Sequence, residues 1–130
     1  MDIQIPIQSD ADIIVARQKG RALAQQIGFS ATDVTLIATA ISELARNIVL
    51  YAKQGEIVLC AVESNSSGMM IVGRDAGPGI RNVRDALRDG FSTSAGLGLG
   101  LPGVKRLMDE FDIDSQLGRG TTISVTKWRR

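Results

Sequence analysis

The 130-residue sequence contains no histidine and a single cysteine, Cys60. The absence of histidine excludes Ser-His-Asp and Cys-His nucleophilic catalysis and removes a common ligand of zinc and iron. A single cysteine excludes an internal disulfide framework and argues against a cysteine-based metal site. Cys60 lies inside the apolar run EIVLCAVE, so we expect it to be a core residue.

The chain also lacks a strong net charge and a long apolar run. Lys and Arg total 15 and Asp and Glu total 14, so nothing in the charge favours nucleic acid or a membrane surface. The N-terminus, MDIQIPIQSD, has no basic region followed by an apolar stretch, and therefore shows no signal peptide. No apolar run approaches the length of a membrane span. We expect a soluble cytoplasmic protein.

The chain does contain an ordered series of strand and helix patterns. They predict one domain over residues 1–130, in the order strand, two helices, two strands, two helices, two strands. Two N-cap signatures, Ser9-Asp-Ala-Asp12 and Ser30-Ala-Thr-Asp33, open the first two helices. A short helix is expected near 82–89, another from Pro102 to about Phe111, and the last two strands around LGRG. This order predicts an α+β domain of two layers, a sheet covered on one face by helices.

The first segment with chemical potential is Ser42-Glu-Leu-Ala-Arg-Asn47, in the long second helix. Glu43 and Asn47 are one turn apart and project together from the helix. An amide oxygen can ligate a hard cation such as Mg²⁺ beside water and phosphate oxygens, and a carboxylate can orient or deprotonate a hydroxyl. Taken alone, the spacing is common and a solvated helix face is the better interpretation.

The second segment, Asp75-Ala-Gly-Pro-Gly79, directly follows a predicted strand. Asp75 could accept a hydrogen bond from an exocyclic amine, which favours adenine. Gly77 and Gly79 allow the backbone to approach a ligand closely or to adopt positive φ. An ordinary Pro-Gly turn that starts with Asp explains the same residues about as well.

The third segment is the glycine-rich run GFSTSAGLGLGLPGVK, residues 90–105. Gly98-x-Gly100-x-x-Gly103 matches the dinucleotide fingerprint as a string, but it does not follow a strand as that fingerprint requires. The glycines also have P-loop spacing, yet Val104 stands where the lysine belongs, and the motifs of ordinary protein kinases are absent. What remains is a glycine loop before a helix whose N-terminus favours phosphate.

Together these segments resemble the ATP-binding fold shared by DNA gyrase, sensor histidine kinases and mismatch-repair ATPases, the Bergerat or GHKL fold. Glu-x-x-x-Asn, Asp-x-Gly-x-Gly, Gly-x-Gly-x-Gly and a late Gly120-Thr121 carry the resemblance, in that order, over almost the whole chain. SELARNI, DAGPGI, DGFSTSAGLG and GLPGVKRLMDEF are similar to the small serine kinases related to anti-sigma factors, and most of all to the switch kinases of the bacterial stressosome. The resemblance implies a two-layer α/β sandwich with a mixed sheet, and no transducer or dimerisation domain.

The resemblance also implies roles for individual residues. Asn47 would hold Mg²⁺ on the phosphates of ATP, and Glu43 would be the general base toward the substrate hydroxyl. Asp75 would bind the adenine amine, assisted by Thr121. Phosphoryl transfer needs positioning and charge neutralisation, so a domain without histidine can perform it. The glycines would serve in two places: close approach of the nucleotide at Gly77 and Gly79, and the lid at Gly96, Gly98 and Gly100.

Lys105 or Arg106 could bring positive charge to the γ-phosphate, although pairing with Asp109 and Glu110 is the simpler interpretation. The resemblance implies a serine or threonine of a STAS-domain protein as the substrate and a regulatory phosphatase as a further partner, with neither nucleic acid nor a membrane. Two alternatives stay open: an anti-sigma factor that sequesters a sigma subunit, and an ATP-gated binding module with little turnover. Glu43 weighs against the second, because a site that only binds has no use for a base.

Overall fold

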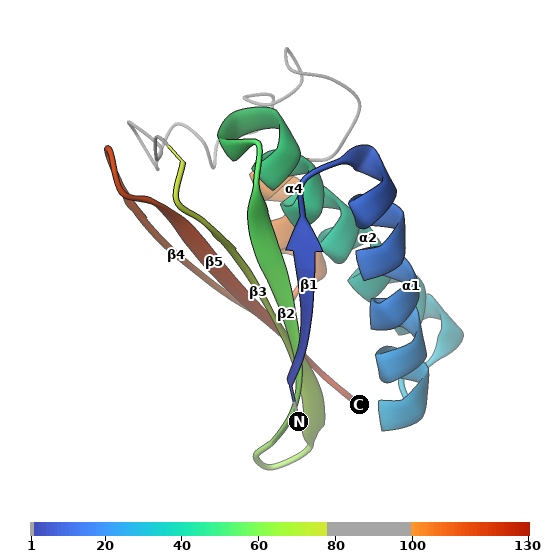
Figure 1. Ribbon diagram of the computed structural model, residues 1–130. Helices are drawn as coiled ribbons and strands as arrows, with labels where there is room; N and C mark the ends of the chain where they lie inside the picture. The colour runs from blue at the N-terminus through green and yellow to red at the C-terminus, as the bar shows by residue number, and fades with distance from the viewer. Residues whose placement is uncertain (1, 78–99) are drawn as a thin grey trace.

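The structure, a computed structural model, describes residues 2–77 and 100–130. The helix expected near 82–89 and the glycines Gly79, Gly96 and Gly98 lie outside these residues. Figure 1 shows a twisted sheet with helices on one side of it. The elements in chain order are β1 (Asp2–Ile7), α1 (Asp10–Ile27), α2 (Ala31–Asn47), the π-helical turn η1 (Ile48–Ala52), β2 (Gly55–Glu63), β3 (Ser67–Asp75), α4 (Gly100–Leu107), β4 (Glu110–Gln116) and β5 (Gly120–Trp128).

The five strands form one sheet in the order β1-β2-β3-β5-β4, and each of the pairings is antiparallel. The expected α+β, two-layer architecture with helices on one face is confirmed (Figure 1). The sheet is antiparallel where a mixed sheet was expected. The reason is that β2–β3 and β4–β5 are hairpins, and β5 rather than β4 lies next to β3.

Local sequence signals determine where the first helices begin and end. The Asp12 carboxylate accepts hydrogen bonds from the backbone N–H groups of Gln8 (2.8 Å) and Ser9 (3.2 Å) at the start of α1. Gly28 ends this helix with φ 102°, a conformation that glycine adopts without strain. The Ser30 hydroxyl accepts from Asp33 N (3.2 Å) at the start of α2. Both predicted N-terminal caps are therefore confirmed.

The hydrophobic core lies between the sheet and the helices. Its largest fully buried side chains are Ile7, Ile37, Ile41, Leu44, Ile57, Leu59, Met69, Ile71, Val104 and Val125. Cys60 is buried as expected, but it follows the core residue Leu59 on β2 and so faces the side of the sheet away from the helices. Burial, together with a hydrogen bond to Asp2, raises the pKa of the Cys60 thiol. The thiol is thus neutral and unreactive at pH 7.

Within the described residues, one helical stretch, Ala31–Ala52, is long and apolar enough to cross a membrane by length and composition. From the sequence, no apolar run of that length was expected. Half of the 18-residue apolar window in it is buried, and its buried apolar side chains belong to the core between the sheet and the helices. The core helix of a globular domain passes the same test, so this stretch is weak evidence for a membrane span.

Replacing Leu44 by alanine tests the contribution of this core helix. Leu44 is 1% exposed, whereas Leu50 on η1 is 48% exposed. We expect Leu44→Ala to lower the free energy of unfolding by roughly 2–5 kcal/mol, because it removes buried methyl groups and leaves a cavity. The matched change Leu50→Ala should stay within about 0.5 kcal/mol of wild type. Urea unfolding followed by circular dichroism measures both, and equal losses would contradict the packing described here.

Candidate active site

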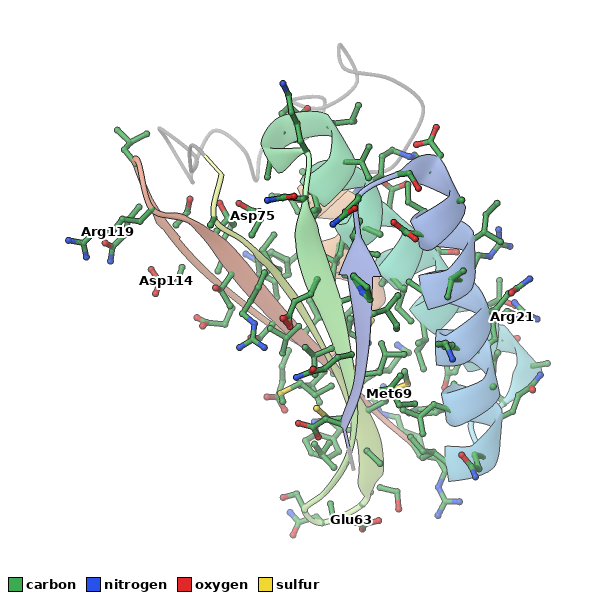
Figure 2. All side chains as sticks on the ribbon, in the orientation of Figure 1. Arg21, Glu63, Met69, Asp75, Asp114 and Arg119 are labelled. Carbon is green, nitrogen blue, oxygen red and sulfur yellow. The ribbon has the colours of Figure 1, made fainter. Side chains whose placement is uncertain are left out.

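A row of residues crosses one end of the sheet on the face that the helices cover. The strand register pairs Gly55 with Asp75, Asp75 with Thr121 and Thr121 with Ser115. Figure 2 labels Asp75 at this end of the sheet and Glu63 at the opposite end. Residues that pair in register point to the same side of a sheet, so the Asp75 carboxylate and the two hydroxyls lie side by side.

Asp75, expected directly after a strand, is the last residue of β3 and is half-buried. Its Oδ1 accepts a hydrogen bond from the backbone N–H of Gly77 (2.9 Å), the pattern of an Asx turn. The other oxygen, Oδ2, has no hydrogen-bond partner within residues 2–77 and 100–130. Asp75 therefore presents a hydrogen-bond acceptor at the end of the sheet, which is what recognition of an amine needs.

Two glycines let the backbone pack closely around Asp75. Gly120 has φ 113°, and a Cβ atom there would lie 2.1 Å from the Asp75 carbonyl oxygen. A Cβ at Gly77 would lie 2.6 Å from the Cβ of Ala52, at the end of η1. At both positions, close packing explains why the residue is glycine. The role in nucleotide approach predicted for Gly77 is a separate matter and stays a prediction.

Thr121 is 8% exposed, and its hydroxyl oxygen lies 2.8 Å from that of Ser115. The Ser115 hydroxyl also donates to the carbonyl of Gly120 (3.3 Å). Thr121 thus stands between Asp75 on one neighbouring strand and Ser115 on the other. The sequence motifs indicated Thr121 but not Ser115.

Glu43 lies on α2 and is only 7% exposed. Its Oε1 accepts from the Arg46 guanidinium (3.2 Å), and its Oε2 accepts from the backbone N–H of Gly100 (3.4 Å), the first residue of α4. Gly100, predicted as a lid glycine, has φ 69° and is buried. The structure therefore brings the predicted base into contact with the end of the glycine-rich run, 57 residues further along the chain.

Asn47 is the last residue of α2, and it is half-buried. The π-helical turn η1 begins at the next residue and ends at Ala52, which packs against Gly77. Single π-helical turns inside helices occur frequently at functional sites. Here η1 runs from the predicted magnesium ligand to the turn that follows Asp75, so it joins the two parts of the candidate site.

Among the described residues, the metal-binding side chains near Asn47 are too few to hold a cation by themselves, so a cation there would need further ligands from a nucleotide. Within the described part of the chain, no three His, Cys, Asp or Glu side chains gather where they could hold a metal ion. A cation at Asn47 would therefore take phosphate oxygens and water as its other ligands, which is the usual manner of Mg²⁺.

Lys105 lies further from the start of its helix than expected. The helix α4 begins at Gly100 rather than Pro102 and ends at Leu107 rather than near Phe111, so Lys105 is exposed in its last turn. Its predicted role at the phosphates stays a prediction.

The acidic residues after α4 bind the C-terminal segment. Asp109 accepts from the Trp128 backbone N–H (2.7 Å) and from the Arg130 guanidinium (2.9 Å). Glu110 accepts from the Trp128 indole N–H (2.6 Å). The buried Lys127 ammonium donates to the Leu107 carbonyl at the C-terminus of α4 (2.8 Å). These contacts tie the C-terminal segment to β4 and to the end of α4.

Two residues of the site were missed from the sequence. Arg46 follows Glu43 by three residues on a helix, a spacing that predicts a side-chain contact. Ser115 lies opposite Thr121 across the LGRG turn, so the hairpin register could have indicated it.

The sequence matches the histidine kinase-like ATPase domain over residues 8–127. The chain belongs to this family. It is 52% identical to the serine/threonine-protein kinase RsbT of Bacillus subtilis (strain 168), over 97% of this chain and 96% of that one. The anti-sigma F factor of Thermoanaerobacter sp. (strain X514) is 28% identical, over 87% of this chain and 82% of the other. The protein is an RsbT-like serine/threonine protein kinase by class, and its family implies that it uses ATP.

Solved structures agree on the fold. The RsbU and RsbW domains of a Mycobacterium tuberculosis protein superpose with a TM-score of 0.69 at 18% identity, over 98% of this chain and 32% of that chain. The mycobacterial sensor histidine kinase MprB superposes with a TM-score of 0.58 at 15% identity, over 100% of this chain and 97% of that chain. The predicted GHKL-type architecture is thereby confirmed.

Gly120→Ala tests the close packing beside Asp75. Both Gly118 (φ 79°) and Gly120 have left-handed conformations, but an added Cβ meets nothing within 4 Å at Gly118. We expect Gly118→Ala to lower the free energy of unfolding by about 1–2 kcal/mol, the cost of the backbone conformation alone. Gly120→Ala should cost at least about 1 kcal/mol more, because its Cβ collides with backbone. Urea unfolding measures both, and equal losses would remove the packing argument.

Proposed function

We propose that this protein transfers the γ-phosphate of ATP to a serine or threonine of a STAS-domain protein. In this proposal it is a switch in a bacterial stress response that controls a sigma factor, and it activates a regulatory phosphatase. The observation that carries the proposal is the Glu43 carboxylate, which is nearly buried, lies one turn from Asn47 and contacts the first residue of α4. The 52% identity to a serine/threonine kinase supports phosphoryl transfer to a hydroxyl as the reaction in which this carboxylate takes part.

The two parts of the site suit the two ends of ATP. Asp75 and Thr121 offer acceptor and hydroxyl oxygens at the end of the sheet, where the 6-amino group of adenine would bind. Asn47 would hold Mg²⁺, which neutralises charge on the phosphates when bound. Gly100 begins the helix that follows the glycine-rich run, and Gly77, Gly79, Gly96 and Gly98 complete the set that we assign to the nucleotide.

Glu43 has the contacts of an oriented base. The Arg46 guanidinium and the Gly100 N–H each hold one of its carboxylate oxygens, which limits the rotation of the side chain. In the proposed reaction the substrate hydroxyl oxygen attacks the γ-phosphorus, the bond to the β-phosphate oxygen breaks, ADP leaves, and Glu43 takes the hydroxyl proton. A positioned general base contributes roughly 10²–10⁴-fold to such rates.

The principal alternative is sequestration of a sigma subunit, as the name of the anti-sigma F factors describes for those relatives. Their identities of 27–31% are well below the 52% identity to the kinase, and we therefore rank this function second. An ATP-gated module without turnover is a third possibility, and the held position of Glu43 weighs against it. We further propose one cytoplasmic domain over residues 1–130, without nucleic-acid or membrane partners.

Glu43→Gln should bind ATP but transfer phosphate roughly 10²–10⁴-fold more slowly, because glutamine cannot accept the proton. The measurement is the intact mass of a candidate STAS-domain protein after incubation with Mg-ATP and each variant. Glu56→Gln is the matched control, since Glu56 is on β2 and pairs with Arg74 on the sheet. Transfer by Glu43→Gln at the wild-type rate would refute its role as base. Bound ATP without transfer by wild type would favour the sigma-binding alternative, which a pull-down with sigma subunits then tests.

Asn47→Ala should weaken binding of ATP in the presence of Mg²⁺ by at least about tenfold, the lower end of what loss of even an outer-sphere metal partner costs. Calorimetric titration with ATP, with and without Mg²⁺, measures the effect. Asn65→Ala, in the exposed turn between β2 and β3, is the matched control and should bind as wild type does. A full response to Mg²⁺ in Asn47→Ala would show that another group holds the cation.

A further inference from the structure

The Ser115 hydroxyl lies at the end of the row Asp75–Thr121–Ser115, on the edge strand β4. Its oxygen is 2.8 Å from the Thr121 hydroxyl oxygen and 3.3 Å from the Gly120 carbonyl oxygen. Ser115 is half-buried and Thr121 nearly buried, so these contacts are largely shielded from water.

The hydrogen bond between the two hydroxyls can run in either direction, and the Gly120 carbonyl next to Ser115 favours one of them. A carbonyl oxygen can only accept, so Ser115 is the donor toward Gly120. A hydroxyl carries one proton, so a Ser115 hydroxyl that donates to Gly120 has none left for Thr121. In that arrangement Ser115 accepts from Thr121, and the lone pairs of the Thr121 oxygen remain for a ligand.

With the hydrogen bond in this direction, the Thr121 hydroxyl oxygen is a hydrogen-bond acceptor beside a second acceptor, the Asp75 carboxylate. The Asp75 carboxylate, its partner in register, can only accept when ionised, and its Oδ2 has no partner in the described part of the chain. Two acceptors side by side suit a 6-amino group, which has two hydrogens to donate. A 6-oxo group would bring a third acceptor to the same place and leave buried polar atoms unpaired.

We infer that Ser115 is a specificity-determining positioning residue: it orients the Thr121 hydroxyl so that the site prefers a 6-aminopurine nucleotide to a 6-oxopurine nucleotide. The inference rests on the proposed binding of ATP at Asp75 and Thr121. Ser115 acts through Thr121. When it is removed, the Thr121 hydroxyl is free to turn its proton toward a ligand, and a 6-oxo group finds a donor.

The test compares binding of ATP and of inosine triphosphate, which carries a 6-oxo group, by calorimetric titration in Mg²⁺. We expect Ser115→Ala to reduce the ratio of the two affinities by about tenfold relative to wild type, which corresponds to about 1.4 kcal/mol of lost discrimination. Ser115→Thr keeps a hydroxyl at the position and should restore most of the preference for ATP. Ser124→Ala, on β5 but three residues from Thr121 and so on the other face of the sheet, should leave the ratio unchanged.

The outcomes separate this inference from the proposed function. Wild type that binds neither nucleotide would refute the proposed function itself. Wild type that prefers ATP, with the same ratio in Ser115→Ala, would refute the inference and leave the function standing. A merely structural role predicts that Ser115→Ala weakens both nucleotides by the same factor, since a loosened hairpin does not distinguish an amino from an oxo group. Unfolding measurements on each variant identify any loss of fold.

Discussion

Burial of one face of α2 against the sheet is the constraint on which the candidate site depends. Ile37, Ile41 and Leu44 are buried completely or almost so, and they determine how the helix is rotated about its axis. A helix turns by about 100° per residue, so this rotation also sets the direction of Glu43 and Asn47. The two polar residues owe their position to the buried apolar side chains of the same helix.

The second half of the site depends on backbone contact between β3 and β5. Gly120 allows its strand to lie against the Asp75 carbonyl, where any other residue would collide. The close approach accompanies the register that pairs Thr121 with Asp75 and with Ser115. The turn η1 then packs at Gly77, so the sheet end and the end of α2 meet through backbone and small side chains. Such contacts leave little room for larger side chains, and they therefore hold the residues of the site in fixed positions.

Positioning is also what the chemistry requires of a chain without histidine. Phosphoryl transfer depends on aligning the reacting oxygen with the phosphorus and on neutralising charge, and both are tasks for held side chains and a bound cation. Glu43 is held by Arg46 and Gly100, and Thr121 by Ser115. Arg46 and Ser115 had no role assigned from the sequence, yet each contacts a residue that had one.

The sequence was enough to predict both helix caps and most of the helices and strands, because capping and periodicity act between neighbours within about four residues. The order of these elements predicted the two-layer architecture, and the family motifs indicated Glu43, Asn47 and Asp75. Tertiary structure alone decided that the sheet is antiparallel, that Gly100 meets Glu43, that Ser115 meets Thr121, and that Asp109 and Glu110 bind the C-terminal segment. Those contacts follow from strand order and register. Both arise from how the whole core packs, because no short pattern of residues encodes which distant segment will lie alongside.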